Sequence, residues 1–399
     1  MFKTIDLFAG CGGLTEGFKR SKIFEIVAGV EWDKDALFTL RNRLSKKWFY
    51  KDAEKRILHF DIQRTNDLVS GYDDELYGSS EGFDKLVKDE SVDVVIGGPP
   101  CQSYSIAGRI RDEKGMHDDY RNFLFESYIK IVDRYRPRAC IFENVLGMLS
   151  AKPGGISITD RVRKSFFDIG YYITDDLKAE AVFDTSEFLV PQKRVRVIIV
   201  AIDMKRYADF KERVNLFYSN LNRYKSEKVV TVSEALGGLP AIFPLESPMP
   251  RSSHFIDKAG EFEITAHEPR YHNERDISIF KLLAEDIQSG GFQYASSDAL
   301  KELYTKKTGR KSSVHKYHVL RSDKPSNTIP AHLYKDGLRH IHPDPSQARS
   351  ITVREAARLQ TFDDDFEFLG SRGSQYKMIG NAVPPVFAEK IALSLGGIL

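Results

Sequence analysis

The stretch DLFAGCGG, residues 6–13, decides the fold because it joins a strand to a glycine-rich turn that lets a ligand approach the backbone closely. Glu31 ends a second strand roughly twenty residues later, where a carboxylate can accept hydrogen bonds from ribose hydroxyls. This pair suits an adenosine-containing cofactor. Thr15 stands where GxGxxG would have its third glycine, so a nucleotide site and a structural turn are equally good interpretations of this stretch alone. Trp32 either lies against an adenine ring or packs in the core.

Short apolar runs alternate with helical patterns through the first half of the chain. We interpret five of these runs as buried parallel strands: Ile5–Phe8, Ile26–Val30, Val92–Ile96, Ala139–Phe142 and Val195–Ile202. Between them, Phe123–Tyr135 carries apolar residues at helical spacing. This alternation predicts a doubly wound α/β sheet with helices on both faces. In such sheets, ligands bind at the carboxyl ends of the strands.

The pattern changes near residue 230. Prolines interrupt the following segment, and it lacks βα alternation as far as Pro345. Regular patterns return with helices predicted at Val353–Thr361 and Val386–Leu395. We therefore predict a second, smaller domain over residues 231–375, within a larger domain made of residues 1–230 and 376–399.

Composition excludes several classes of protein. The 399 residues contain 41% hydrophobic and 29% charged residues, as ordinary globular proteins do. No apolar run approaches the roughly 20 residues of a membrane span, and the N-terminus enters a strand-like segment with no room for a signal peptide. The three cysteines (Cys11, Cys101 and Cys140) lie far apart, which excludes a disulfide framework and a cysteine zinc site and fits a reducing cytoplasm.

The turn GGPPCQSYS, residues 97–105, follows the run Val92–Ile96 and holds Cys101 at the ligand edge of the sheet. A lone cysteine is more often a buried hydrophobe than a nucleophile, but a rigid turn above the sheet favours the nucleophile. Glu143 ends the next strand and reaches the same edge. A thiol and a carboxyl group facing one pocket indicate covalent attack assisted by acid catalysis.

Two further basic features have alternative interpretations. Arg194 and Arg196 alternate by two, so they point the same way on an extended segment. They either hold an anionic or carbonyl oxygen near the thiol or form an exposed basic edge. The basic cluster between Lys301 and Lys324 is either a phosphate-binding face or a solvated lysine-rich loop, and the net charge of +2 does not decide between them.

The motifs DLFAGCGG, VEWD, GGPPCQSYS, ENV, PQKRVR, REAARLQ and IGNAVPP occur in this order between Thr4 and about Ile391. The ordered set resembles the motif series of the DNA cytosine-5 methyltransferases. The segment from Ile202 to Pro325 has no recognisable motif and lies where that family has its variable target-recognition region. The resemblance implies a Rossmann-like, S-adenosylmethionine-dependent methyltransferase sheet over residues 1–230 and 376–399. It implies an irregular target-recognition domain over residues 231–375, including the motif Arg354–Gln360.

By this resemblance, the cofactor is S-adenosylmethionine. Glu31 holds its ribose, Trp32 packs on its adenine, and Asp61 reads the adenine amino group. The other cofactor-binding residues that the resemblance implies are Phe8, Gly10, Gly12, Leu124, Asn381 and Val383. No metal is expected, because the chemistry needs none.

The resemblance also implies the reaction. The Cys101 thiolate attacks C6 of a cytosine, and C5 then takes the methyl group. Glu143 hydrogen-bonds the N3 and amino edge, Arg196 holds the O2 side, and Arg194 orients the acid and the nucleophile. A base that the sequence does not identify removes the C5 proton before Cys101 leaves. The target base must be flipped out of the duplex, at a cost of a few kcal/mol.

DNA contacts are expected on both sides of the predicted domain boundary. Gln102, Ser105 and Arg109 lie in a charged segment that corresponds to the family's mobile loop, which closes over the DNA. Thr328 resembles the threonine of a Thr-apolar pair near the end of the target-recognition region. With DNA as the substrate, the Lys301–Lys324 cluster becomes a phosphate-contacting surface. His340 and His342 lack ligand-spaced partners, and we interpret them as structural or DNA-adjacent.

Three alternatives compete with this interpretation. A transfer-RNA cytosine-5 methyltransferase would share the motifs, but the Cys-Phe-Thr tripeptide of the RNA-directed branch is absent. A non-catalytic DNA-binding relative would not need the intact catalytic set. A nicotinamide-dependent oxidoreductase leaves the Pro-Pro-Cys turn unexplained. We therefore expect a monomeric, sequence-specific DNA methyltransferase of a prokaryotic restriction–modification system, cytoplasmic and nucleoid-associated, with no membrane contact and a separately encoded endonuclease as its partner.

Overall fold

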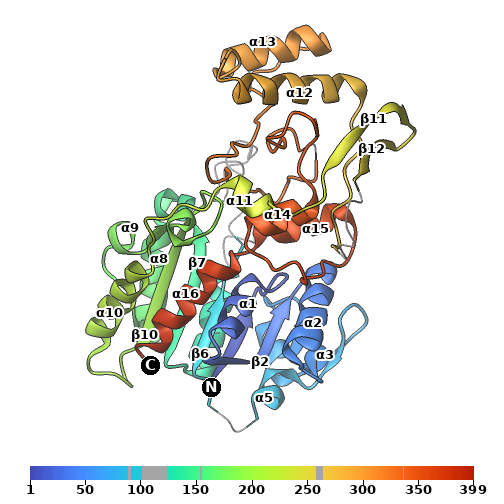
Figure 1. The fold of residues 1–399 in the computed structure, drawn as a ribbon. Helices are drawn as coiled ribbons and strands as arrows, with labels where there is room; N and C mark the ends of the chain where they lie inside the picture. The colour runs from blue at the N-terminus through green and yellow to red at the C-terminus, as the bar shows by residue number, and fades with distance from the viewer. Residues whose placement is uncertain (89–90, 101–123, 153–154, 258–263, 336) are drawn as a thin grey trace. The chain divides into compact units, whose positions relative to one another are not determined.

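The computed structural model describes residues 1–399 except 89–90, 101–123, 153–154, 258–263 and 336. The chain divides into two compact units (Figure 1). The first unit contains residues 1–189, 194–228 and 382–399, and the second contains residues 190–193 and 229–381. The short piece Val190–Lys193 thus groups with the second unit, although the sequence places it inside the larger domain. The predicted roles of catalytic and target-recognition domain stay predictions.

A mixed eight-stranded sheet lies at the centre of the first unit. Its strands follow the spatial order β3 (Ile57–His59), β2 (Phe24–Glu31), β1 (Phe2–Leu7), β6 (Val94–Gly97), β7 (Ala139–Val145), β10 (Val195–Asp203) and β8 (Tyr171–Tyr172), with β9 (Val182–Asp184) also paired to β10. All neighbours from β3 to β7 are parallel. The strand order reverses between β1 and β6, which is the point where open α/β sheets bind their ligands. The predicted doubly wound α/β fold is confirmed.

The direction of β10 differs from the prediction. We predict Val195–Ile202 as a parallel strand, and this is wrong because β10 runs antiparallel to β7, β8 and β9. β9 comes shortly before β10 in the chain and pairs with it, Asp184 opposite Val195, so the chain turns back instead of crossing over the sheet. An unbroken apolar run indicates that both faces are buried, but it carries no information about strand direction.

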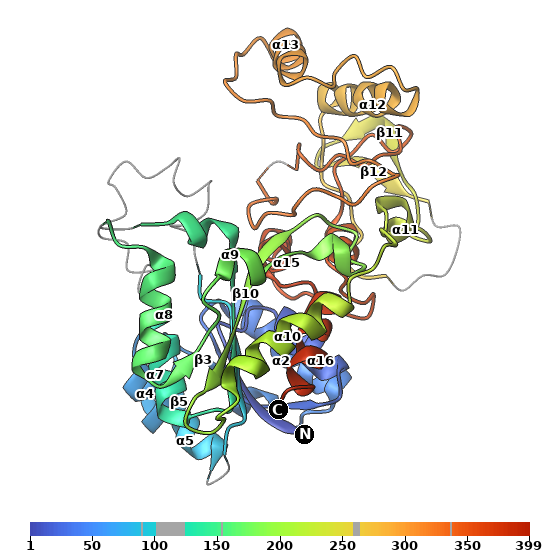
Figure 2. The ribbon, with the colours of Figure 1, turned by 90° about the vertical axis from the view of Figure 1, so that its left-hand side faces the viewer.

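Helices cover both faces of this sheet. Figure 2 shows α7 and α8 on one face and α2, α10 and α16 on the other. The helices of this unit are α1 (Gly13–Arg20), α2 (Lys34–Trp48), α3 (Ala53–Arg56), α4 (Thr65–Ser70), α5 (Gly82–Val87), α7 (Leu124–Tyr135), α8 (Ile158–Asp168), α9 (Leu177–Glu180), α10 (Phe210–Arg223) and α16 (Pro385–Gly396), with short 3-10 helices η2 (Leu146–Ser150) and η4 (Thr185–Phe188) and a small hairpin, β4 (Tyr72–Asp74) and β5 (Gly78–Ser80). In the described part of the chain, no helix is both long enough and apolar enough to cross a bilayer.

Two contacts show how the helices are fastened to the sheet and to each other. The hydroxyl of Tyr128 on α7 lies 3.0 Å from the carbonyl oxygen of Val95 and 2.9 Å from that of Ile141, so it joins the helix to β6 and β7. Gly17 lets α1 and α16 meet, because a Cβ there would lie 2.4 Å from the Cβ of Ala388. The bounds of α7 and α16 confirm the helices predicted at Phe123–Tyr135 and Val386–Leu395. Phe123 itself lies outside the described residues.

The second unit consists of short helices, one hairpin and long irregular segments. Its elements are α11 (Val232–Leu236), β11 (Ile242–Met249), β12 (Ser252–Ile256), α12 (Glu274–Gln288), α13 (Ser297–Thr308), α14 (Val353–Leu359) and α15 (Arg372–Asn381). Phe280 on α12, Leu303 on α13 and Tyr317 belong to one buried cluster. The lack of βα alternation in this region is confirmed, because β11 and β12 form an antiparallel pair.

A buried ion pair lies at the start of α14. Arg349 and Glu355 are each 1% exposed, and two 2.7 Å bonds join the guanidinium to the two carboxylate oxygens. Glu355 also accepts a hydrogen bond from the backbone N–H of Thr352, which closes a capping box at the helix N-terminus. The helix predicted over Val353–Thr361 is confirmed and ends at Leu359.

Candidate active site

The carboxyl ends of β1, β2 and β3 bring several predicted cofactor-binding residues to one edge of the sheet. Glu31 pairs in register with His59, so the residues that follow β2 and β3 are neighbours. The backbone N–H of Gly10 donates to Oε2 of Glu31 at 2.7 Å, and that of Asp33 donates to Oε1 at 2.7 Å. Burial raises the pKa of the Glu31 carboxyl group, and these two hydrogen bonds oppose the shift. The backbone therefore holds this carboxylate in one orientation.

The glycine-rich turn leaves room on one side and is tightly packed on another. Gly10 has a φ of 56°, and a Cβ there would meet no atom within 4 Å, so open space borders the turn. Phe8, at a φ of 57°, adopts the same left-handed conformation without being glycine. A Cβ at Gly13 would lie 2.3 Å from the carbonyl oxygen of Val383, so the C-terminal segment packs directly against the turn.

The remaining predicted cofactor residues occupy different positions. Trp32 is 61% exposed, which excludes the alternative that it packs in the core. Asp61 follows β3, and its Oδ1 accepts a hydrogen bond from the backbone N–H of Gln63 at 3.0 Å. Leu124 is buried at the start of α7, and Asn381 is exposed at the end of α15 in the second unit. Gly12, at a φ of 94°, precedes α1.

Asp6 is a residue of this edge to which the sequence assigns no role. It is fully buried, and the hydroxyl of Thr15 donates to its Oδ2 at 2.5 Å. Burial raises its pKa to about 7, against the effect of Thr15 and with a smaller contribution from Glu31. The sequence feature that could have identified Asp6 is its position near the end of a buried strand, just before the glycine-rich turn. Thr15, which replaces a glycine of GxGxxG, turns out to be the partner of this carboxyl group.

The catalytic candidates Glu143, Arg194 and Arg196 come together where β7 and β10 pair. Nε of Arg196 lies 2.9 Å from Oε1 of Glu143, and the two side chains are only 11% and 12% exposed. Burial lowers the pKa of the Arg196 guanidinium, and Glu143 opposes the shift. Arg194 is 1% exposed, and burial and then the neighbouring Arg196 lower its pKa. A nearly buried carboxylate with two guanidinium groups beside it can hold a polar substrate edge in a fixed orientation.

The turn that leads to Cys101 lies against this cluster. A Cβ at Gly98 would be 2.7 Å from Oε2 of Glu143, so any larger residue here would displace this carboxylate. Nδ2 of Asn144 donates to the carbonyl oxygen of Pro99 at 3.4 Å and ties the turn to β7. Four predicted site residues, Cys101, Gln102, Ser105 and Arg109, lie outside the described residues.

The sequence did not predict that two glutamines of the second unit hold separate segments of the backbone together. Oε1 of Gln192 accepts a hydrogen bond from the backbone N–H of Ile329 at 3.0 Å, and its Nε2 donates to Oε1 of Gln360 at 3.0 Å. Nε2 of Gln360 donates in turn to the carbonyl oxygen of Ile379 at 2.6 Å. Both side chains are fully buried. Their only signal in the sequence was their place in PQKRVR and REAARLQ. Next to them, Thr328 is exposed, and its hydroxyl donates to the carbonyl oxygen of Lys193 at 2.8 Å.

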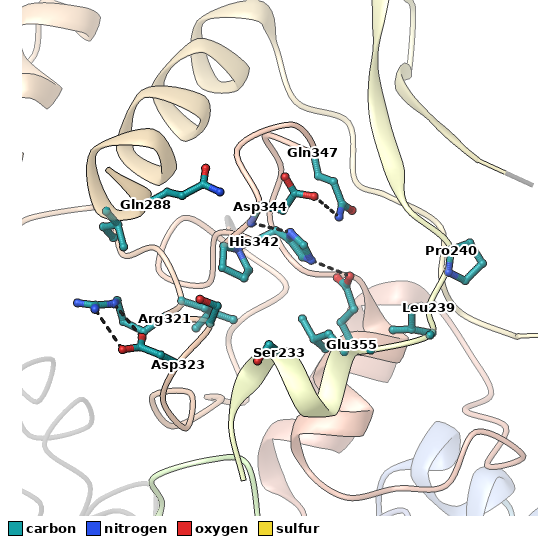
Figure 3. A pocket seen from close by; sticks show the side chains of 17 residues that line it. Ser233, Leu239, Pro240, Gln288, Arg321, Asp323, His342, Asp344, Gln347 and Glu355 are labelled. Carbon is teal, nitrogen blue, oxygen red and sulfur yellow. Dashed lines mark hydrogen bonds and ion pairs between the residues drawn. The ribbon is translucent and has the colours of Figure 1, made fainter. Parts of the chain in front are cut away.

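A cavity of about 560 Å³ also lies in the second unit (Figure 3). Its wall includes His342, whose Nε2 is 3.6 Å from Oε1 of Glu355, and burial lowers the pKa of His342 to about 4. Arg321 of the predicted Lys301–Lys324 cluster also lines the cavity, but none of the predicted catalytic or cofactor-binding residues does. Throughout the described ranges, no three His, Cys, Asp or Glu side chains are grouped so that they could hold a metal ion.

Comparison with known proteins identifies the family. The family model of the C-5 cytosine-specific DNA methylases matches residues 2–397. The type II methyltransferase M.Bpa9945I of Bacillus paralicheniformis is 32% identical over 99% of this chain and 98% of its own. M.AgeI of Thalassovita gelatinovora, also a type II methyltransferase, is 29% identical over 98% of each chain.

Solved structures share the fold. A protein encoded within an E. coli prophage, solved as a candidate DNA modification methyltransferase, superposes with a TM-score of 0.64 at 23% identity, covering 100% of this chain and 99% of the other. The Dnmt2 methyltransferase of S. pombe superposes with a TM-score of 0.53 at 14% identity, covering 99% and 97%. The family model and the sequence relatives both span almost the whole chain, and this chain therefore belongs to the C-5 cytosine-specific DNA methylases.

Proposed function

We propose that this chain transfers a methyl group from S-adenosylmethionine to C5 of a flipped-out cytosine in duplex DNA, through a covalent bond between Sγ of Cys101 and C6. The observation that carries the proposal is the ion pair of Glu143 and Arg196 at the carboxyl edge of the sheet, directly beside Gly98 in the turn before Cys101. Family membership supports the reaction type, and the motif resemblance supports the role of each residue.

The edge formed by β1, β2 and β3 has the hydrogen-bond acceptors that the ribose and adenine of S-adenosylmethionine need. The backbone orients both oxygens of Glu31, and each oxygen keeps a lone pair for a ribose hydroxyl. The open space beside Gly10 admits the ligand, the exposed ring of Trp32 would cover the adenine, and Asp61 would accept from the adenine amino group. Phe8, Gly12, Leu124, Asn381 and Val383 would complete the site. When bound, this cofactor supplies an electrophilic methyl group.

The residues of this chain then act on the cytosine. The Cys101 thiolate forms a bond to C6, which turns C5 into an enamine-like carbon. Glu143 hydrogen-bonds the N3 and amino edge as charge arrives there, and Arg196 holds the O2 side. Arg194, which is buried beside Arg196, would orient the acid Glu143 and the nucleophile Cys101. C5 takes the methyl group, a base removes the C5 proton, and the electrons of that C–H bond restore the ring and expel the thiolate.

The names of the relatives support a role in restriction and modification. The chain would methylate the site that a separately encoded endonuclease cuts when it is unmethylated, acting as a monomer on DNA in the bacterial nucleoid. Thr328 of the second unit, together with Gln102, Ser105 and Arg109, would contact that DNA. Plasmid DNA modified by the protein should resist one endonuclease specificity and remain sensitive to others, and light scattering of the purified chain should give the mass of one copy.

Covalent trapping tests the chemistry. Duplex DNA with 5-fluorocytosine at the target should form a cofactor-dependent adduct that survives denaturing electrophoresis, because fluorine at C5 cannot leave as a proton would. Cys101→Ser should abolish the adduct. An adduct that survives this substitution would overturn the mechanism, and trapping of RNA but not of DNA would overturn the substrate.

Cys140 provides the matched control. It is fully buried, and burial raises the pKa of its thiol well above the ordinary value, so it cannot act as the nucleophile. Cys140→Ala should therefore trap DNA as the unsubstituted protein does. Glu143→Gln should keep DNA binding and slow the trapping, because the amide loses the ion pair with Arg196 and cannot relay a proton to cytosine N3 during attack.

A further inference from the structure

One arginine of the second unit is oriented by a neutral partner. Arg339 is exposed, and its Nη2 donates to Nε2 of His315 at 3.0 Å. Nδ1 of His315 lies 3.1 Å from the carbonyl oxygen of Tyr317, which can only accept, so Nδ1 carries the hydrogen and Nε2 is the bare acceptor. The imidazole thus orients the guanidinium without neutralising it. No carboxylate among the described residues pairs with Arg339.

Several other arginines of this unit are paired with carboxylates. Three of them form ion pairs with a neighbouring aspartate: Arg275 with Asp276, Arg321 with Asp323, and Arg358 with Asp364. The positive charge of each of these guanidinium groups is balanced by an aspartate of the same protein. A cation that is held in place but left uncompensated is what a site for an external anion requires.

A second exposed cation is anchored to the same place. Nδ2 of Asn327 donates to the carbonyl oxygen of Arg339 at 3.4 Å, and the hydroxyl of Thr328 donates to the carbonyl oxygen of Lys193 at 2.8 Å. The backbone N–H of Lys193 also donates to the carbonyl oxygen of Ser326 at 2.8 Å. Because Asn327 and Thr328 are consecutive, about 3.8 Å apart at Cα, the two basic residues are fixed to adjacent positions of one segment.

A buried histidine packs against this segment. His340 is 1% exposed and lies against the backbone of Asn327 and Thr328. Burial, with a contribution from His318, lowers the pKa of His340 to about 3, so its ring adds no charge beneath the two cations at neutral pH. At neutral pH, Arg339 and Lys193 therefore carry positive charge at this surface and His340 does not.

We propose that Arg339 and Lys193 form a two-cation site for the sugar–phosphate backbone of DNA beside Thr328, with His315 as the residue that positions Arg339. The inference rests on the proposed function, because it takes duplex DNA as the partner. A guanidinium can bind a phosphate through two parallel N–H bonds, and an ammonium adds a point charge. Such contacts set affinity and register but read no bases, so their loss should weaken binding to all DNA sequences alike.

The salt dependence of DNA binding tests this site. Each phosphate contact contributes about 0.9 to the slope of log affinity against log salt. Arg339→Ala and Lys193→Ala should each reduce the slope by about 0.9, and each should weaken binding about tenfold at fixed salt. Arg339→Lys should keep the slope and recover only part of the affinity, because it retains the charge and loses the fork. Arg275→Ala, which removes an arginine already paired to Asp276, should change neither quantity.

The positioning role of His315 has its own readout. His315→Phe keeps a ring and removes the acceptor, so the KM for DNA should rise while kcat at saturating DNA stays unchanged. His315→Gln offers an amide oxygen in place of Nε2 and should restore the KM. Unchanged slopes in Arg339→Ala and Lys193→Ala would overturn the site. If the unsubstituted protein binds DNA but forms no adduct with 5-fluorocytosine, the proposed chemistry fails, and the slopes still decide the phosphate site.

Discussion

Replacing Glu355 by glutamine should destabilise the second unit strongly. Glu355 and Arg349 are each 1% exposed, and two 2.7 Å bonds join them. The substitution removes the negative charge and leaves the Arg349 guanidinium buried without compensation. It also weakens the capping box with Thr352 at the N-terminus of α14.

The size of the effect follows from the burial of the pair. Removing one partner of a buried ion pair costs about 3–5 kcal/mol, whereas an exposed pair contributes about 1 kcal/mol or less. Although burial alone would raise it, Arg349 holds the pKa of Glu355 well below its usual range. Glu355 therefore stays charged down to strongly acidic pH. The stabilisation that it provides should be lost only in strong acid.

Hydrogen exchange measured by mass spectrometry can locate this loss. Both tryptophans, Trp32 and Trp48, belong to the first unit, so tryptophan fluorescence reports on that unit and serves as an internal control. Amides of Val353–Leu359 should exchange about two to four orders of magnitude faster in Glu355→Gln, because each 1.4 kcal/mol is roughly a tenfold change. Fluorescence-detected unfolding of the first unit should stay unchanged.

Two comparisons make the result decisive. Glu285→Gln is the same chemical change in the same unit, at a pair with Lys281 that is 3.9 Å apart and more than half exposed, and it should alter exchange less than about threefold. Arg349→Met combined with Glu355→Leu should cost much less than the sum of Arg349→Met and Glu355→Leu, because no buried charge remains. A change of less than about fivefold in Glu355→Gln would refute the view that this pair stabilises the unit.

The two units should respond to pH in opposite directions. In the first unit, the pKa of Asp6 is raised to about 7, so the folded state holds a proton that the unfolded state releases near pH 4, and stability falls by about 4 kcal/mol as pH rises from 4 to 7. Asp6→Asn should abolish this fall in fluorescence-detected urea unfolding, and an unchanged pH profile would contradict the assignment. In the second unit, burial lowers the pKa values of His254 and His342 to about 4 and of His272 to about 3. The unfolded state then takes up protons first, so stability is complete above about pH 6.5 and falls on acidification, by about 2 kcal/mol per histidine at pH 5. The protection factors of the α12 amides, which correct for slower intrinsic exchange in acid, should fall at pH 5, and unchanged protection there would contradict this expectation.

Most of the sheet could be predicted from the sequence because burial leaves a direct pattern. The runs that form β1, β2 and β7 are apolar and short, and the polar residues that follow them, such as Glu31 and Glu143, had to lie at the carboxyl edge of a parallel sheet. The direction of β10 could not be predicted, because an apolar run records burial and not the partner strand. The helices α14 and α16 could be predicted because their buried apolar residues recur at helical spacing.

The polar contacts of the site were less accessible to prediction. The sequence brought Glu143, Arg194 and Arg196 to the same edge, but it left open whether the arginines formed an exposed basic strand. Their burial, and the 2.9 Å contact between Arg196 and Glu143, exclude that alternative. The role of Thr15 as partner of Asp6 also escaped prediction, because a hydrogen bond between two side chains depends on a turn geometry that residue spacing does not specify.

The motif PQKRVR shows why the unit boundary could not be found from sequence pattern. Its first residues make their hydrogen bonds within the second unit: Ser326 donates to the carbonyl oxygen of Pro191, and Gln192 bonds Gln360, 168 residues further along the chain. Arg194 and Arg196, which follow at once, belong to the first unit and to its cluster with Glu143. The first half of this short stretch thus packs in the second unit, and its second half packs in the first unit. An inserted residue between Gln192 and Arg194 would therefore have to break either the buried glutamine pair or the register of Arg196 against Val145 in β7.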